Sequence, residues 1–468
     1  MVVDGWKGKS RVFKALGPVH VSEPGSRPLF RHPAQVVVFG FGCAVLVGTV
    51  VLMLPVSRTG PGGAPFLVAL FTSTSAVCVT GLVVVDTPSY WSGFGEAVIL
   101  GLIQIGGFGI MTFASLLGLL ISRRMGLRTR LTAAAETKAV GLGDVRTVIV
   151  GVVKVSLFFE ALTALCLCLR FLLGYGEPVG PAIYHGVFHA ISAFNNAGFA
   201  LYSDSLIGFA TDPWICLPIA IAVIAGGLGF PVLFELRREL RRPHLWSMHT
   251  KMTVTVTALL LALGTVFVTV SEWNNPGTLG ALDTPGRLLA GFFQAVMPRT
   301  AGYNSVDYGQ MEQGTLLGTD ILMFIGGGSA GTAGGIKVTT FALLFFVIYA
   351  EVRGERHVDA FDRRIDDRAT RQALTVALLS VAAVVAATVV LLEITALATH
   401  QVLFEAISAF ATVGLSTGIT ADFPPSGQLI LIALMFFGRL GPITLVSALA
   451  LRERQRLYQL PEGRPIIG

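Results

Sequence analysis

The chain has 468 residues, of which 53% are hydrophobic and only 13% carry a charge. Soluble domains carry charge on about 25% of their residues, and apolar runs of roughly 20 residues, long enough for a membrane-spanning helix, recur along this sequence. The composition excludes a soluble enzyme, a nucleic-acid-binding protein and a secreted disulfide scaffold. It indicates a multi-pass protein of the cell membrane that contacts membrane lipids and no nucleic acid.

The net charge of +6 reflects where the basic residues stand. Of the 34 lysines and arginines, 27 lie in five short clusters, at residues 1–31, 122–146, 235–251, 351–371 and 452–464. Basic segments that flank membrane spans usually face the cytoplasm, so the N- and C-termini are both predicted to be cytoplasmic. Such surfaces can also bind an acidic partner or lipid headgroups.

Residues 1–35 are predicted to form a cytoplasmic N-terminal segment, because they lack the uninterrupted apolar core of a cleavable signal. A short interfacial helix and a disordered tail are both compatible with their mixture of apolar and basic residues. The rest of the chain is predicted to form four repeats and a C-terminal tail. The repeats are 36–130, 131–245, 246–368 and 369–456, and the tail is 457–468.

Each predicted repeat has the same order of elements: a long apolar run, a shorter segment and a second long apolar run. The opening runs are about 36–54, 147–173, 252–270 and 372–397. The closing runs are about 94–121, 213–236, 316–349 and 428–451. Every basic cluster after residue 31 follows a closing run, so both long runs are expected to cross the membrane. The shorter segment between them then lies toward the outer side.

The four shorter segments align without a gap. They read FTSTSAVCVTGL from Phe71, FHAISAFNNAGF from Phe188, FFQAVMPRTAGY from Phe292 and FEAISAFATVGL from Phe404. Each has a glycine ten positions after its first aromatic residue, and these glycines are 117, 104 and 112 residues apart, close to one quarter of the chain. Such regular spacing is typical of an internal repeat.

These segments are too short to cross the membrane as helices. Non-helical backbone survives at membrane depth only where it is buried in protein or lines a water-filled cavity. Four equivalent re-entrant loops can line one shared cavity. The sequence therefore predicts an all-α integral membrane protein in which four helix–pore loop–helix repeats, with about eight transmembrane helices, surround a central ion pore.

The loops end in small residues, hydroxyl residues and glycine, so that backbone carbonyl oxygens can face an axis and replace the hydration shell of a potassium ion. The predicted potassium selectivity filter consists of Val79, Thr80, Gly81, Leu82, Asn196, Ala197, Gly198, Phe199, Thr300, Ala301, Gly302, Tyr303, Thr412, Val413, Gly414 and Leu415. The alternative is that the four glycines only allow helices to pack closely where they cross.

These four motifs resemble the filters of the Trk/Ktr/HKT superfamily of potassium transporters, and the resemblance extends from Val36 to Arg456. With eight long runs, the chain is most similar to the membrane (B) subunit of the Ktr potassium-uptake system. The resemblance implies potassium as the substrate and no cofactor in this chain. It also implies a homodimer and a cytoplasmic ring of regulatory subunits that bind the nucleotide. Gly81 stands where a serine accompanies sodium preference in the plant branch, which points to potassium.

An arginine interrupts the closing run of the fourth repeat. The motifs GGFG, GGLG and GRLG occupy Gly106–Gly109, Gly226–Gly229 and Gly438–Gly441. Arg439 thus stands where two other repeats have glycine. A charge inside a span is costly and usually faces a cavity or a partner. A cationic barrier in the permeation path, which the resemblance also implies, is favoured over an ion pair with a buried carboxylate such as Glu160 or Glu393.

The closing run of the third repeat contains GGGSAGTAGGIK, which is too rich in glycine and serine to remain helical in lipid. The resemblance implies an intramembrane gating loop that obstructs the pore beneath the filter. The predicted gating residues, in addition to Arg439, are Gly326, Gly327, Gly328, Ser329, Ala330, Gly331, Thr332, Ala333, Gly334 and Gly335. A nucleotide-binding P-loop is disfavoured, because Ile336 separates Gly335 from Lys337.

The remaining polar residues suggest structural roles. His185 and His189 lie one helical turn apart without a third metal ligand, so helix packing or a position at the outer mouth is favoured. Arg299, beside the third filter segment, is interpreted as a tether behind it.

The filter segments contain no carboxylate, which favours passive movement of potassium over a proton- or sodium-coupled secondary transporter. A nucleophile or metal cluster suited to a membrane-embedded enzyme is not recognisable, and sodium dependence is left open.

Overall fold

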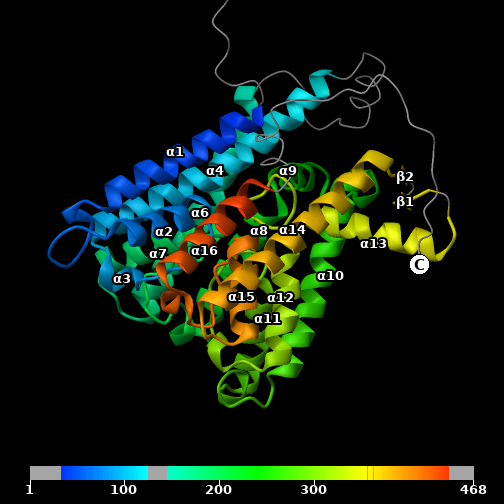
Figure 1. Cartoon of the computed structure of the whole chain (residues 1–468). Helices are drawn as coiled ribbons and strands as arrows, with labels where there is room; N and C mark the ends of the chain where they lie inside the picture. Colours follow the sequence, from blue (N-terminus) through cyan, green and yellow to red (C-terminus); the bar gives the residue numbers. More distant parts are fainter. Residues whose placement is uncertain (1–32, 125–144, 356, 362, 442–468) are drawn as a thin grey trace, which may run out of the picture.

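The computed structural model describes residues 33–124, 145–355, 357–361 and 363–441. Within these ranges the chain is mostly helical, with long helices packed side by side and shorter helices between them (Figure 1). The predicted N-terminal segment up to residue 32, most of the basic cluster at 122–146, and the residues beyond 441, including the tail at 457–468, lie outside the described residues.

The first two repeats have the expected order of a long helix, a short helix and a closing helix. The helices of the first are α1 (Pro33–Leu52), α2 (Phe66–Val77), α3 (Thr87–Tyr90) and α4 (Gly93–Arg124). Those of the second are α6 (Val145–Gly174), α7 (Val179–Phe194), α8 (Pro213–Leu228) and α9 (Phe230–Glu239). The chain bends by 103° between α8 and α9. Gly229 allows this bend because its φ of +91° is open to glycine and strained for other residues.

The closing run of the third repeat consists of two helices, because its glycine-rich segment forms a loop. The helices of this repeat are α10 (Met248–Ser271), α11 (Thr284–Val296), α12 (Gln313–Phe324) and α13 (Val338–Val352). A small antiparallel hairpin, β1 (Asp359–Ala360) with β2 (Arg363–Arg364), leads to the fourth repeat. That repeat contains α14 (Asp367–Ile394), α15 (Thr399–Ala411) and α16 (Pro425–Leu440). Short 3-10 turns lie at Pro55–Ser57, Ile207–Phe209, Pro243–Leu245, Leu279–Ala281, Tyr308–Gln310 and Thr420–Asp422.

The repeats follow one another around a ring. Within each repeat the opening helix packs on the short helix, in the pairs α1–α2, α6–α7, α10–α11 and α14–α15. Neighbouring repeats meet through the pairs α4–α6, α8–α11, α12–α15 and α16–α2. The last of these pairs joins the fourth repeat to the first, so the circle is closed. The ends of the four short helices therefore lie within one assembly of long helices.

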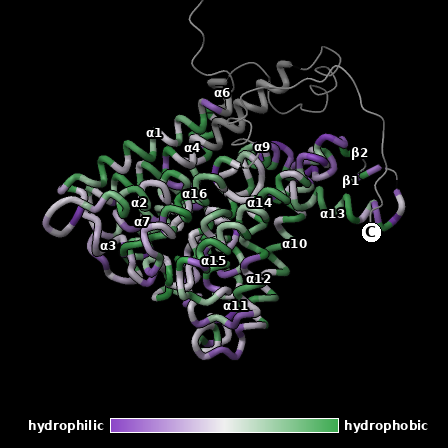
Figure 2. Tube along the Cα trace, viewed as in Figure 1, coloured by the Kyte–Doolittle hydropathy of each residue, from purple (hydrophilic) through white to green (hydrophobic). Residues whose placement is uncertain are grey.

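The surface of this assembly suits a lipid environment. In the part of the chain that the structure describes, the three helices Ile149–Gly174, Met248–Glu272 and Asp367–Ile394 are long and apolar enough to cross a membrane, and α8 with α9 is a fourth candidate. Shorter apolar stretches lie in α1, α4, α13 and α16. Figure 2 shows hydrophilic residues gathered at α9 and the β1–β2 hairpin, and in the loops at the opposite end. The predicted all-helical membrane fold is confirmed.

Candidate functional site

The four predicted filter segments meet at one place, where each filter glycine lies against the backbone of the next repeat. A Cβ atom added to any of these glycines would lie within 3.0 Å of a carbonyl oxygen in the neighbouring segment, which leaves no room for a side chain. The pairs of glycine and carbonyl are Gly81 with Ala197, Gly198 with Ala301, Gly302 with Val413, and Gly414 with Thr80. Because the last pair returns to the first repeat, the segments form a closed ring of backbone.

The filter backbone alternates in handedness. Each filter glycine has a positive φ, between +69° and +94°, and so has the residue two positions earlier in every repeat. These earlier residues are Val79 (φ +55°), Asn196 (+60°), Thr300 (+73°) and Thr412 (+51°). A left-handed residue other than glycine costs roughly 1–2 kcal/mol, and such strain persists where the surroundings enforce it. An alternation of this kind allows successive carbonyl groups to face one side, which carbonyl coordination of an ion requires.

The side chains of the filter pack into the protein. The residue that follows each glycine is at most 1% exposed and belongs to a hydrophobic core cluster; these residues are Leu82, Phe199, Tyr303 and Leu415. Two serines of the short helices hold the filter backbone from behind. Ser75 Oγ accepts a hydrogen bond from the Gly81 N–H at 3.0 Å, and Ser408 Oγ accepts one from the Gly414 N–H at 3.1 Å. The ring therefore offers backbone oxygens, and no carboxylate, to an ion.

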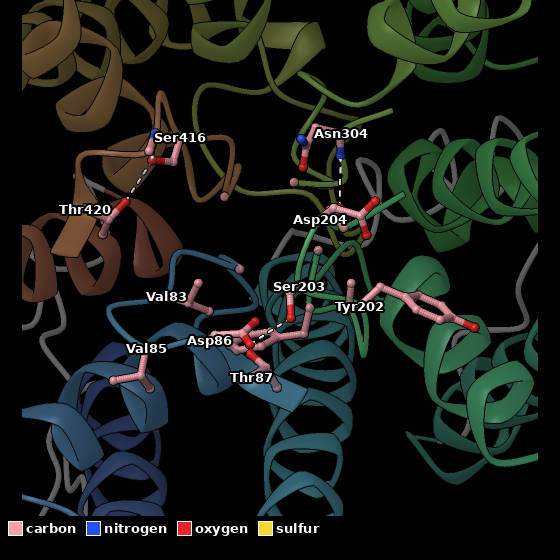
Figure 3. A pocket seen from close by; sticks show the side chains of 18 of the residues that line it. Val83, Val85, Asp86, Thr87, Tyr202, Ser203, Asp204, Asn304, Ser416 and Thr420 are labelled. Carbon is pink, nitrogen blue, oxygen red and sulfur yellow. Dashed lines mark hydrogen bonds between the residues drawn. The ribbon is translucent and has the colours of Figure 1, made fainter. Parts of the chain in front are cut away.

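A cavity of about 430 Å³ adjoins the ring and is lined by all four filter glycines. Its wall also carries three carboxylates, Asp86, Asp204 and Asp307, of which the first two are labelled in Figure 3. Asp86 accepts a hydrogen bond from Ser203 Oγ at 2.8 Å, which links the first two repeats across the mouth. Carboxylates at a narrow mouth raise the local concentration of cations. These three residues were not among those predicted, although they follow the filter glycine by five or six positions in three repeats.

Short helices point their carbonyl ends toward the ring. Gly106, Gly226 and Gly438 approach the last turns of α2, α7 and α15 so closely that a Cβ atom would lie within 3.0 Å of a backbone oxygen there. The carbonyl end of a helix carries roughly half a negative charge. This partial negative charge would favour a cation over an anion at the ring without any charged side chain.

The predicted gating loop joins α12 to α13 and is held by backbone hydrogen bonds. Its two ends pair in parallel, with the Gly326 N–H donating to the Ile336 carbonyl at 2.8 Å. Its middle packs on the break between α8 and α9, where the Gly328 N–H donates to the Gly227 carbonyl at 2.7 Å. The loop of the third repeat is therefore seated on the second repeat.

The same loop also contacts two filter segments. The Thr332 hydroxyl lies 3.0 Å from the side-chain amide of Asn196, in the second segment. Gly334 packs against Thr412 of the fourth segment, where an added Cβ atom would collide with the threonine hydroxyl. Any displacement of the loop must therefore break contacts with the filter.

Three basic side chains hold carbonyl groups of the loop. Arg299 Nη2 donates to the Gly326 carbonyl at 2.9 Å, Lys337 Nζ donates to the Ala333 carbonyl at 2.5 Å, and Arg439 Nη1 donates to the Thr332 carbonyl. Arg439 also reaches the Gly106 carbonyl through Nη2 at 3.3 Å. Both arginine side chains are nearly fully buried, Arg299 at 6% exposure and Arg439 at 3%. They concentrate positive charge at the loop, next to the filter.

The ion pair considered for Arg439 is not observed among the described residues. Glu160 instead accepts hydrogen bonds from Gln104 Nε2 at 3.0 Å and Asn195 Nδ2 at 3.3 Å, and Glu393 is exposed. A guanidinium bound to carbonyl groups keeps its full charge, whereas a carboxylate would neutralise it. Arg439 therefore presents an uncompensated positive charge at the loop.

The two histidines of α7 hydrogen-bond within the second repeat. His185 Nδ1 lies 3.0 Å from a Glu177 carboxylate oxygen. His189 is buried, and its Nε2 accepts a hydrogen bond from the Leu201 N–H at 3.3 Å. Among the described residues, no group of three or more histidine, cysteine or acidic side chains is arranged to hold a metal ion.

The sequence from residue 19 to 458 matches the family model described as TrkH, cation transport protein. The chain belongs to this family. It is 42% identical over 440 residues to Ktr system potassium uptake protein B of Bacillus subtilis (strain 168), covering 93% of this chain and 97% of that protein. It is 34% identical over 442 residues to potassium/sodium uptake protein NtpJ of Enterococcus hirae, again covering 93% and 97%.

A solved structure supports the fold of this family member. The crystal structure of the potassium transporter TrkH from Vibrio parahaemolyticus superposes with a TM-score of 0.67, covering 92% of this chain and 86% of that one. The identity is 18%, so this similarity concerns the fold. Together with the family match, it shows a multi-pass membrane transport protein and not an enzyme.

Proposed function

We propose that the chain is the potassium-translocating pore subunit of a bacterial-type potassium-uptake system. A potassium ion sheds its water at the outer cavity and binds to carbonyl oxygens of the four filter segments. It then moves inward down its electrochemical gradient, driven by about 2.3 kcal/mol per 100 mV of membrane potential. The observation that carries this proposal is the closed ring, in which every repeat contributes a glycine and a carbonyl at the same register.

Three further features support a cation as the substrate. Carboxylates line the outer cavity, short helices point their carbonyl ends toward the ring, and two relatives are named for potassium uptake. The name of the Enterococcus relative also includes sodium. Sodium dependence of this chain is accordingly part of the test below.

The glycine-rich loop at residues 326–335 and Arg439 form the gate of this pore. In the described arrangement the loop is seated between the α8–α9 break and the filter, and Arg439 binds it through the Thr332 carbonyl. A positive charge at this position opposes a cation that leaves the filter. Opening requires the loop to move away from the α8–α9 break and Arg439 to break its hydrogen bond to the Thr332 carbonyl.

Regulation is assigned to partners. The resemblance to Ktr systems suggests a homodimer that binds a cytoplasmic ring of nucleotide-binding subunits. The basic residues of α9 and of the segment around β1 and β2 are suited to bind that ring or anionic lipids, if they face the cytoplasm together with both termini.

The test is cation flux into proteoliposomes with an imposed potential. The wild-type protein is compared with Gly81→Ser, in which the added side chain collides with the Ala197 carbonyl at a φ of +93°. We expect wild-type flux to be selective for potassium and the variant to lose that preference. The control is Gly101→Ser, since the space around Gly101 is open and this residue is exposed on α4.

Flux is measured with sodium present and absent, and with and without a proton gradient. If transport required a proton gradient and were insensitive to Gly81→Ser, a coupled secondary transporter would replace the pore. An equal loss of selectivity in Gly101→Ser would mean that the filter is not at the ring.

A further inference from the structure

In three of the four repeats, a side chain of the short helix accepts hydrogen bonds from the backbone just beyond the filter. These side chains are His189, Gln294 and Glu405, and they are at most 1% exposed. Each one reaches the residue that lies three positions after the filter glycine. The shared register indicates a common task carried out by three different acceptor groups.

We call each of these three side chains the brace of its repeat. The brace of the second repeat is the imidazole of His189. His189 Nε2 accepts from the Leu201 N–H at 3.3 Å, while Nδ1 lies 2.8 Å from the His185 carbonyl. Since a backbone N–H can only donate, Nε2 must carry the lone pair and Nδ1 the proton. The ring of Tyr202 stacks on His189 with a centroid separation of 5.3 Å, which fixes the imidazole plane. His189 is therefore a neutral, oriented acceptor.

The brace of the third repeat is an amide. With the Gln294 amide oriented to satisfy its neighbours, its oxygen accepts from the Ser305 N–H at 2.7 Å and its nitrogen donates to the Tyr308 hydroxyl at 2.7 Å. Gln294 stands one position later in the ungapped motif than the other braces. Burial explains this offset, because the fully buried aromatic of this repeat is Phe293, and Phe292 is only partly buried.

The brace of the fourth repeat is a carboxylate. Glu405 accepts hydrogen bonds from the Ser416 hydroxyl, from the Thr420 hydroxyl at 3.2 Å and from the Thr417 backbone. Ser416 and Thr420 line the outer cavity and bond to each other at 2.9 Å (Figure 3). A completely buried carboxylate thus holds the strand that leaves the filter.

The first repeat has no such brace. Its corresponding residue is Thr72, which is 1% exposed, and its hydroxyl has no hydrogen-bond partner. The hydroxyl forms no hydrogen bond with Val84, three positions after Gly81. The first filter segment is therefore held by its packing, by the Ser75 hydroxyl and by backbone hydrogen bonds to the end of α2, such as Val79 N–H to the Ala76 carbonyl at 3.1 Å.

We infer that His189, Gln294 and Glu405 are positioning residues that hold the outer ends of three filter segments and thereby set the ion selectivity of the ring. They touch no ion. Selectivity depends on the number and the fixed arrangement of coordinating carbonyl groups. A segment without its brace relaxes toward the axis and accommodates a smaller ion, so sodium is discriminated less well.

The test measures the ratio of potassium to sodium flux in proteoliposomes for full-length variants. Glu405→Ala removes the brace, whereas Glu405→Gln keeps an acceptor for the backbone N–H. The matched control is Thr72→Ala, at the equivalent buried position without a brace. We expect Glu405→Ala to lower the ratio by about tenfold, as the loss of a buried hydrogen bond allows. Glu405→Gln and Thr72→Ala should retain the wild-type ratio.

His189→Ala provides a second, independent case, and size-exclusion profiles show which variants fold. If Glu405→Ala and His189→Ala both fold and keep the wild-type ratio, the inference is wrong. The inference is also wrong if Thr72→Ala lowers the flux ratio as much as Glu405→Ala does. Loss of buried packing alone would then explain the effect. An equal effect of Glu405→Gln would mean that charge, and not the hydrogen bond, is responsible.

This inference rests on the proposed function, yet the two can fail separately. A wild-type protein that moves no potassium contradicts the proposed function. The role of the braces is tested by comparing the ratio of the fluxes of two monovalent cations between the variants and the wild type, for any two cations that the wild type transports.

Discussion

At the scale of single residues, the proposed path for the ion is formed by backbone, and the side chains around it hold that backbone in place. Serines and the three braces hold the filter from behind, while Arg299, Lys337 and Arg439 hold the loop by its carbonyl groups. Arginine suits this task because its planar fork can bind two carbonyl oxygens at once and keeps its charge at any physiological pH.

Replacement of Arg439 should make the pore leak. Arg439→Gln removes the charge and weakens the hold on the Thr332 carbonyl. A unit charge within several ångströms of the path opposes a cation by roughly 1–2 kcal/mol, so potassium flux in proteoliposomes should rise about tenfold. Arg241→Gln, at an exposed arginine after α9, is the control and should change nothing. Unchanged or reduced flux in a folded Arg439→Gln protein would contradict a barrier role.

At the scale of elements, the proposed gate depends on the fit between a broken helix and a loop from another repeat. Gly229 is the corner of the break, and a Cβ atom there would collide with the Ser329 carbonyl. The adjacent Phe230 N–H donates to the Ala330 carbonyl at 3.2 Å. The loop can keep its seat only while this corner remains free of a side chain.

Gly229→Ala should therefore displace the loop. The variant adds a clash and roughly 1–2 kcal/mol of backbone strain at a positive φ, so we expect several-fold higher basal potassium flux. Gly180→Ala is the matched control in the same repeat, because nothing lies within 4 Å of its added Cβ atom. If basal potassium flux fell in Gly229→Ala, or rose equally in both variants, the corner between α8 and α9 would have no role in gating.

Repetition made most of this architecture predictable from the sequence. Four glycines in the same register predict the filter segments, and the glycine-rich stretch predicts the break between α12 and α13. The braces were not predictable, because histidine, glutamine and glutamate share no pattern and Gln294 is offset by one position. The contacts of the loop with Gly227 and Asn196 depend on tertiary packing, which no local sequence pattern encodes.

At the scale of the whole molecule, the two ends of the helical assembly differ in character. The cavity beside the filter ring carries Asp86, Asp204 and Asp307, whereas α9 and the β2 strand at the other end carry arginines. Figure 2 shows hydrophilic residues at both ends and mainly apolar residues between them. This separation of charge predicts a single orientation in the membrane.

Thiol labelling in intact cells tests that orientation. A membrane-impermeant maleimide should label Ser203→Cys, which is exposed beside the outer cavity, and should label Arg241→Cys only after the membrane is permeabilised. The wild-type protein is the blank, since Cys78 and Cys216 are buried and the remaining cysteines are only partly exposed. Labelling of Arg241→Cys in intact cells would contradict the proposed orientation, because residue 241 would then face the outside.

The contact between Gly414 and the Thr80 carbonyl also has a consequence for biosynthesis. A chain emerging from the ribosome can insert three repeats into the membrane, but the backbone ring stays open on one side until the fourth repeat arrives. The ring is completed only when the fourth repeat has been made. Truncated or stalled chains that lack the fourth repeat therefore lack a closed ring, so the proposed pore is not complete before all four repeats are in place.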